Sequence, residues 1–157
     1  MERRAPVTML RLLRTLARVG LCLALSLAVP AVAEDRLVLL VGAESSITSL
    51  SSVDVHKLFL GLTVVVEGQR LHPLRNDSDE LMRRIFFQNI VSMSESVYDR
   101  RMLALTLQHG RAAPPVLRST NEVLDALATD PDAVSFTCAA DAERDPRVRV
   151  LRVLWGC

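Results

Sequence analysis

The sequence predicts an α/β domain over residues 34–157, a sandwich in which a mixed β-sheet is flanked by helices. Short apolar or alternating runs, which are typical of strands, stand near both ends of this region. Helix-capping signatures followed by amphipathic segments lie between them. Because these signals alternate without a repeat or a low-complexity linker, we expect one domain with one core.

The segment that precedes this domain, residues 1–33, has the features of a secretory signal peptide. Arginines open it, an apolar stretch follows over residues 21–29, and the small residues of a cleavage site stand at 31–33. We therefore expect cleavage after Ala33 and export to the periplasm or the exterior. The apolar stretch is shorter than the roughly 20 residues of a membrane-spanning helix. An uncleaved segment that holds the chain at the membrane is the alternative.

The domain begins with a strand and a helix. Residues 37–41 form a short, continuous apolar run, as expected for a strand that is buried on both faces. Ser51 is placed to cap a helix over residues 53–60, whose apolar side chains fall on one face. Gly61 directly after it is a typical helix stop.

Two β segments and a second helix are expected next. Residues 63–66 and 70–74 read as β segments around a glycine turn. Pro73 cannot donate a hydrogen bond to a neighbouring strand, so the second segment lies at a sheet edge or ends early. Asp77, three residues before Glu80, forms the capping signature of the helix that follows.

Two further helices precede the last strands. Ser92 and Glu95 repeat the capping pattern and open a helix that ends before Gly110. Ser119 and Glu122 open the final helix, which an Asp-Pro pair closes. In the last of these helices, Val123, Leu124 and Leu127 are expected to face inward.

The last two strands are expected at residues 133–138 and 148–154. Cys138 ends the first of them, and Cys157 lies shortly after the second. In an oxidising compartment we expect Cys138 and Cys157 to form a disulfide that fixes the C-terminus. Closing a loop of this length would stabilise the fold by about 3 kcal/mol in the chain-entropy model. Two unpaired thiols, or a bond from Cys157 to another chain, are the alternatives.

Charge and motifs exclude several classes of function. The leader carries +4 of the formal net charge of +1, so residues 34–157 carry −3 and no basic face for nucleic acid. The histidines His56, His72 and His109 have no metal-ligand spacing, so we expect neither a metal nor another cofactor. The chain lacks the Gly-x-Ser-x-Gly, His-Glu-x-x-His and phosphate-loop motifs, and we expect no enzymatic activity.

The order of the motifs resembles the phosphate-binding component of ABC phosphate transporters, in the type 2 periplasmic-binding-protein superfamily. It resembles the short single-lobe relatives of that component most, and the likeness covers about residues 37–154. The residues that carry it are Leu50-Ser51-Ser52 and Phe59-Leu60-Gly61, the segment from Gly68 to Leu74, then Tyr98, Gly110, Pro114 and Pro115, and the unit from Ser119 to Val134.

The resemblance implies one lobe of a two-lobed clamp that holds an oxyanion such as phosphate. The family's Arg-x-Asp-Gly-Ser-Gly-Thr loop is matched in part by residues 75–79. Arg75 would give bidentate donors to the oxyanion and Ser78 would add a hydroxyl. Asp77 would accept a hydrogen bond from a protonated oxygen. The resemblance also implies a link to ABC-type phosphate transport.

Ser45 and Ser46 complete the expected ligand site. They follow the first strand, and open α/β sheets bind ligands beyond the C-terminal ends of their strands. The loop also departs from the family's pattern, since both glycines are missing and Asp79 and Glu80 add negative charge beside Asp77. The second lobe of the clamp is not part of this sequence.

Two alternatives follow from these departures. In one, Asp77 only caps the helix and Arg75 is a solvated surface residue. In the other, the lobe has lost solute binding and serves as a protein-interaction module of the cell envelope. A homodimer is also compatible with solute binding, because a second copy would supply the missing wall of the cleft.

Overall fold

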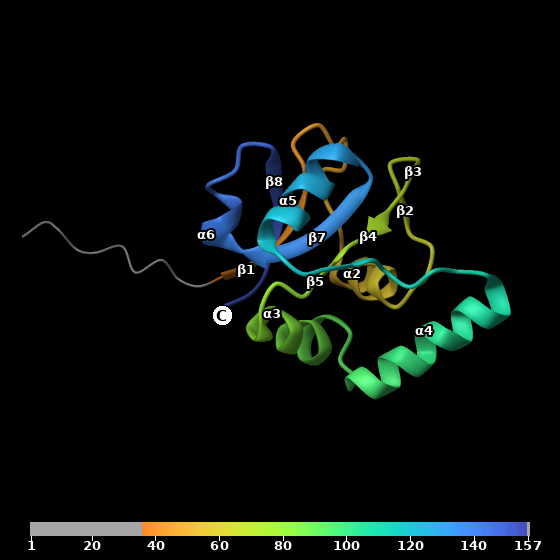
Figure 1. Ribbon diagram of the computed structural model, residues 1–157. Helices are drawn as coiled ribbons and strands as arrows, with labels where there is room; N and C mark the ends of the chain where they lie inside the picture. Colours follow the sequence, from red (N-terminus) through yellow and green to blue (C-terminus); the bar gives the residue numbers. More distant parts are fainter. Residues whose placement is uncertain (1–35, 157) are drawn as a thin grey trace, which may run out of the picture. The chain divides into compact units, whose positions relative to one another are not determined.

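The computed structural model describes residues 36–156 of the chain, so the predicted signal peptide and Cys157 lie outside the described residues. Within these bounds the chain forms a mixed four-stranded sheet with helices on both faces (Figure 1). The fold class predicted from the sequence is confirmed. In chain order the elements are β1 (Arg36–Gly42), α2 (Ser52–Phe59), β2 (Val65–Val66), β3 (Gln69–Arg70), β4 (His72–Pro73), β5 (Arg75–Asn76), α3 (Glu80–Ile85), η1 (Phe86–Ile90), α4 (Glu95–His109), β6 (Val116–Leu117), α5 (Thr120–Thr129), β7 (Ala133–Cys138), α6 (Ala139–Ala142) and β8 (Val148–Gly156).

The sheet has the strand order β4-β7-β1-β8. β1 is antiparallel to both of its neighbours, whereas β4 runs parallel to β7. β4 is therefore an edge strand, as Pro73 predicts, and it is only two residues long. The predicted β segments around the glycine turn form the separate two-stranded ribbon β2-β3.

Side chains of β1 alternate between two apolar cores, because successive residues of a strand point to opposite faces. Leu37, Leu39 and Val41 join the core beneath α2, α3, η1 and α4. Val38 and Leu40 join a smaller core beneath α5 and α6. The continuous apolar run of the first strand is thus explained by burial on both faces, as the sequence predicts.

Three of the predicted helix ends are confirmed. The hydroxyl of Ser51 accepts a hydrogen bond from the amide of Asp54 at 3.1 Å. That of Ser119 accepts from the amide of Glu122 at 3.2 Å. Gly110 ends α4 in the left-handed conformation, with φ of 62°.

Two predicted caps are wrong by two residues. Asp79, not Asp77, caps α3, and its carboxylate accepts from the amide of Met82 at 2.9 Å. The residue before α4 is Ser94, whereas Ser92 adopts a positive φ of 53° in the preceding turn. Each region contains the capping pattern of a short polar residue three positions before an acid. In both regions, however, the residue that precedes the helix lies two positions after the one that the pattern predicts.

The helix expected after residue 77 is also shorter than predicted. It ends at Ile85 and continues as the π-helical turn η1 over Phe86–Ile90. The sequence also did not predict the parallel pair β5-β6, in which Arg75 pairs with Val116. This pair brings the segment that follows α4 beside the predicted ligand loop. Among residues 36–156, no helix is long and apolar enough to cross a membrane.

Candidate functional site

Arg75 is the central residue of the predicted ligand loop, and it is buried, with 6% of its surface exposed. Its Nε and Nη2 atoms donate to the two carboxylate oxygens of Asp77 at 3.0 and 2.8 Å. Its guanidinium carbon lies 5.0 Å from the ring centre of Phe86 and 4.8 Å from that of Phe87. The prediction that Arg75 is solvated is therefore wrong, because ring contacts and an ion pair hold it inside the fold.

Hydrogen bonds hold the turn that follows Arg75. The Asn76 side chain is buried and donates to the carbonyl of Phe136 at 2.8 Å, while its amide oxygen accepts from the backbone N–H of Ser78 at 2.9 Å. The backbone N–H of Asp77 donates to the carbonyl of Leu117 at 2.8 Å. The carboxylate of Asp77 therefore pairs with Arg75 and does not cap a helix.

The hydroxyl of Ser78 differs from the other polar groups of this turn that are described above. Its Oγ atom is buried and has no hydrogen-bond partner among the described residues. Burial of a hydroxyl without a partner costs free energy. The Ser78 hydroxyl is therefore a group that would gain from a bound water or ligand.

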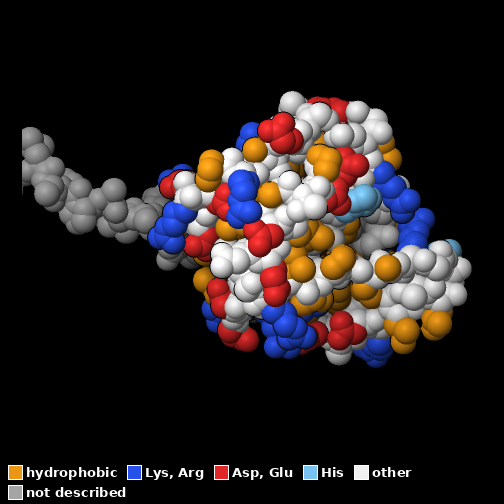
Figure 2. All heavy atoms as spheres, turned by 45° about the horizontal axis from the view of Figure 1, so that its top comes forward, with side chains coloured by type: hydrophobic (Ala, Val, Ile, Leu, Met, Phe, Trp, Pro, Cys, Tyr) orange, Lys and Arg blue, Asp and Glu red, His pale blue; other side chains and the backbone are white. Residues whose placement is uncertain are grey.

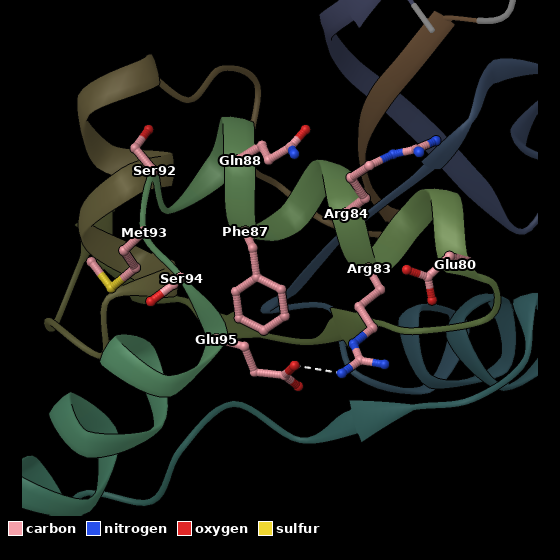
Figure 3. A pocket seen from close by; sticks show the side chains of 9 residues that line it. All are labelled: Glu80, Arg83, Arg84, Phe87, Gln88, Ser92, Met93, Ser94 and Glu95. Atoms are coloured by element: carbon pink, nitrogen blue, oxygen red, sulfur yellow. Dashed lines mark hydrogen bonds and ion pairs between the residues drawn. The ribbon is translucent and has the colours of Figure 1, made fainter.

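An open hollow adjoins the turn, between α3, η1 and the start of α4 (Figure 3). Arg83 and Glu95 point toward one another across it and form an ion pair, with the ring of Phe87 beside them. This contact with Glu95 raises the pKa of Arg83. Arg84 points away from that pair in the same view.

Negative charge exceeds positive charge around the turn. Asp77, Asp79, Glu80 and Glu95 are four carboxylates, against the guanidinium groups of Arg75, Arg83 and Arg84. Glu95 lies 3.9 Å from the Nη2 atom of Arg75, so it also approaches the buried cation. The turn and its hollow therefore lack the net positive charge that attracts a free anion.

Ser45 and Ser46 have local partners near the ribbon β2-β3. The Ser45 side chain is buried, and its hydroxyl is 3.4 Å from the amide of Ile47. Ser46 is exposed and donates to the side-chain oxygen of Gln69 at 2.6 Å. The carbonyl of Ser45 accepts from Arg149 at 3.0 Å. Both serines therefore serve to fix the loop that follows β1.

The five predicted ligand residues do not form one site. β1 ends where β7 begins, because this pair is antiparallel. β4 runs parallel to β7, so the turn with Arg75, Asp77 and Ser78 lies where β7 ends. Ser45 and Ser46 are consequently at the opposite end of the sheet. The expectation failed because it assumed that β1 runs parallel to the strand that leads to Arg75.

A second hollow, which the sequence did not predict, lies beside β4. Four segments that are distant in the sequence line it: the turn after α2, β3 with β4, the segment after α4, and the end of α5. Its charged and titratable side chains are Arg70, His72, His109, Arg111 and Asp130. The ring of His72 bonds to the carboxylate of Asp130 at 2.9 Å. Local motifs do not reveal this cluster, because only the tertiary fold brings its segments together.

Among the described residues, no group of three or more His, Cys, Asp or Glu side chains is arranged to hold a metal ion. Cys138 is half-buried at the end of β7. Its expected partner Cys157 lies outside the described residues, so the disulfide stays a prediction.

Tyr98 is a buried group of α4 whose ionisation should affect stability. Burial raises its pKa to about 12, and its hydroxyl donates to the carbonyl of Phe59 at 3.0 Å. The unfolded chain ionises this phenol near pH 10, so stability is fully present below pH 10 and is lost as the pH rises toward 12. We expect a loss of about 1.4 kcal/mol per pH unit in this range. Urea denaturation at several pH values measures it, and the loss should be absent in Tyr98→Phe. An equal loss in both proteins would contradict the assignment.

Comparisons with known proteins identify the fold. No family model matches the sequence, and no curated protein matches it. Solved structures do match. An ABC-type phosphate transport receptor from Vibrio cholerae aligns with a TM-score of 0.54 and 15% identity over 75% of this chain and 46% of that chain. The protein PstS from Borrelia burgdorferi aligns with a TM-score of 0.53 and 15% identity over 74% of this chain and 46% of that chain.

These matches place the domain in a structural class. Its structural neighbours are substrate-binding proteins of phosphate ABC transporters, as the order of the sequence motifs suggests. The likeness is one of fold, and the chain spans less than half the length of those structures. The protein therefore has a solute-binding-like fold.

Proposed function

We propose that this chain is an exported, non-catalytic protein that uses a solute-binding-like lobe as an interaction module of the cell envelope. The observation that carries the proposal is the bonding of Arg75, the residue expected to hold an oxyanion. Two of its nitrogens already bond to the carboxylate of Asp77. An internal carboxylate thus occupies the position that an external oxyanion would need.

The charges around this turn support the same conclusion. The Asp79 carboxylate already accepts from an amide at the start of α3, so that helix end is also used internally. Glu80 and Glu95 add further negative charge at the adjoining hollow. A phosphate dianion approaching Arg75 would meet these carboxylates, and their repulsion is only partly offset by Arg83.

The surface of α4 supports contact with another protein. Leu103 and Leu107 are exposed, with Leu107 at 77%. They are four residues apart and lie on the same face of the helix. In Figure 1, α4 extends away from the four-stranded sheet. Exposed apolar side chains that cluster in this way mark sites of protein contact.

A second candidate function is the binding of phosphate or a similar oxyanion at this turn, in connection with ABC-type phosphate transport. The buried, unpartnered hydroxyl of Ser78 is the observation that favours it. The structural neighbours agree with it, since they include an ABC-type phosphate transport receptor.

Titration calorimetry with inorganic phosphate separates the two functions. If solute binding is lost, the full chain should give no binding heat up to about 1 mM phosphate, which corresponds to an affinity weaker than about −4 kcal/mol. Ser78→Ala and Ser46→Ala are a matched pair, since both remove a hydroxyl but only Ser78 belongs to the turn. Micromolar binding that Ser78→Ala weakens and Ser46→Ala leaves unchanged would contradict the proposal and establish the second candidate.

The interaction itself is tested by chemical crosslinking of the full chain in intact cells. We expect a crosslinked species that contains a second envelope protein. Leu103→Ser combined with Leu107→Ser should reduce its yield, whereas Arg83→Gln, at the hollow beside Arg75, should not. A chain recovered only as a monomer would refute the interaction function, whatever the outcome of the phosphate titration.

A further inference from the structure

The hollow beside β4 combines positive charge that has no ion-pair partner among the described residues with apolar walls. We propose that it is a binding site for a small organic anion, one with an anionic head group and an apolar body. The site shares no lining residue with the turn that contains Arg75 or with the hollow beside that turn. The proposal does not depend on the interaction function and goes beyond it.

Two guanidinium groups of the hollow are available for the head group. Arg70 comes from β3, and Arg111 comes from the segment that follows α4. Neither forms an ion pair with a carboxylate of the described residues. The Nη1 atom of Arg111 donates weakly to the carbonyl of Gly61 at 3.4 Å, which leaves its other donors open. This differs from Arg75, whose bidentate partner is part of the chain.

The remaining titratable groups leave the hollow positive. Asp130 is the lining carboxylate, and it is already engaged with His72 and with the amide of Asp132. With neutral histidines the lining carries two guanidinium charges against one carboxylate. Residues 34–157 together carry −3, so this hollow is a positive region on a negative domain. Such a region concentrates anions from solution.

The walls of the hollow select an apolar body. Leu58, Leu62, Leu71, Pro73 and Pro114 contribute to the lining, and Leu62 is partly exposed there. The hollow has a volume of about 850 Å³, within the range of small-molecule sites. In Figure 2 basic and histidine side chains gather at the right of the face shown, beside hydrophobic ones. Inorganic phosphate alone would leave these apolar walls in contact with water.

Three probes test the proposal on the full chain: phenyl phosphate, phenylacetate and inorganic phosphate. Binding is followed by titration calorimetry and by the amide NMR signals of Gly61, Leu71 and Arg111. We expect phenyl phosphate, phenylacetate or both to bind and to shift these signals. Inorganic phosphate should bind at least about tenfold more weakly, which is about 1.4 kcal/mol. Comparing the first two probes tells whether the head group is a phosphate or a carboxylate.

A charge-matched pair of variants shows whether the binding is local. Arg70→Gln with Arg111→Gln should weaken the binding of the organic probe at least about tenfold. Arg83→Gln with Arg84→Gln removes the same charge at the other hollow and should leave the affinity unchanged. An equal thermal unfolding midpoint confirms that each double variant is folded. Binding of neither organic probe, equal weakening in both double variants, or inorganic phosphate binding as tightly would each overturn the proposal.

Discussion

Arg75→Ala should reduce the free energy of unfolding by about 3 kcal/mol, the range seen when one partner of a buried ion pair is removed. The substitution leaves the Asp77 carboxylate, which is 15% exposed, without its cation. It also removes the guanidinium from the rings of Phe86 and Phe87. Urea denaturation of the variant and of the original chain measures the difference.

Two further variants control for this interpretation. Arg84→Ala removes an exposed arginine of α3 and should change the unfolding free energy by less than about 0.5 kcal/mol. Arg75→Met combined with Asp77→Leu replaces the ion pair with apolar groups and should recover most of the loss. A cost below about 1 kcal/mol for Arg75→Ala would show that the pair is worth no more than a solvent-exposed one.

Phe86→Ala should destabilise the fold by about 4 kcal/mol, as other buried Phe→Ala substitutions do. The Phe86 ring is fully buried, and its centre lies 5.7 Å from that of Phe59 and 5.9 Å from that of Phe136. It is also 5.2 Å from the rings of Phe87 and Tyr98. This side chain therefore joins α2, η1, α4 and β7, and its loss leaves a cavity that the surrounding rings cannot fill without moving.

Thermal and urea unfolding measure this loss, which is large beside a typical total stability of about 5–15 kcal/mol. Phe86→Leu keeps most of the volume and should cost clearly less than Phe86→Ala. Leu107→Ala removes an exposed side chain and should cost less than about 0.5 kcal/mol. Equal effects of Phe86→Ala and Leu107→Ala would refute the described core.

Local sequence patterns were sufficient for most elements of the fold. The apolar run at residues 37–41 predicted β1, because a strand buried on both faces contains few polar residues. Ser51 and Ser119 predicted the starts of α2 and α5, since a hydroxyl that satisfies a free amide acts within three residues. Where Asp77 and Asp79 both stood near a helix start, the pattern did not distinguish them. Asp77 is bonded to the buried Arg75, so Asp79 is the carboxylate that caps α3.

The candidate site depended on information that is not local. Because β1 is antiparallel to β7, Ser45 and Arg75 lie at opposite ends of the sheet. The residues of a short apolar run do not indicate in which direction the strand will pair. The burial of Arg75 involves the rings of Phe86 and Phe87, which belong to the π-helical turn that the sequence did not predict. The hollow with Arg70 and Arg111 likewise exists only after the segment following α4 returns to the sheet.

The position of β1 also has a consequence for biogenesis. It is an inner strand, and both of its neighbours are distant in the sequence, since β7 begins at Ala133 and β8 at Val148. A ribosome must therefore deliver the chain at least as far as β7 before Arg36–Gly42 gains its first partner strand. A nascent fragment that stops before residue 133 would leave this apolar segment unpaired and exposed to solvent. Such fragments bind chaperones or aggregate.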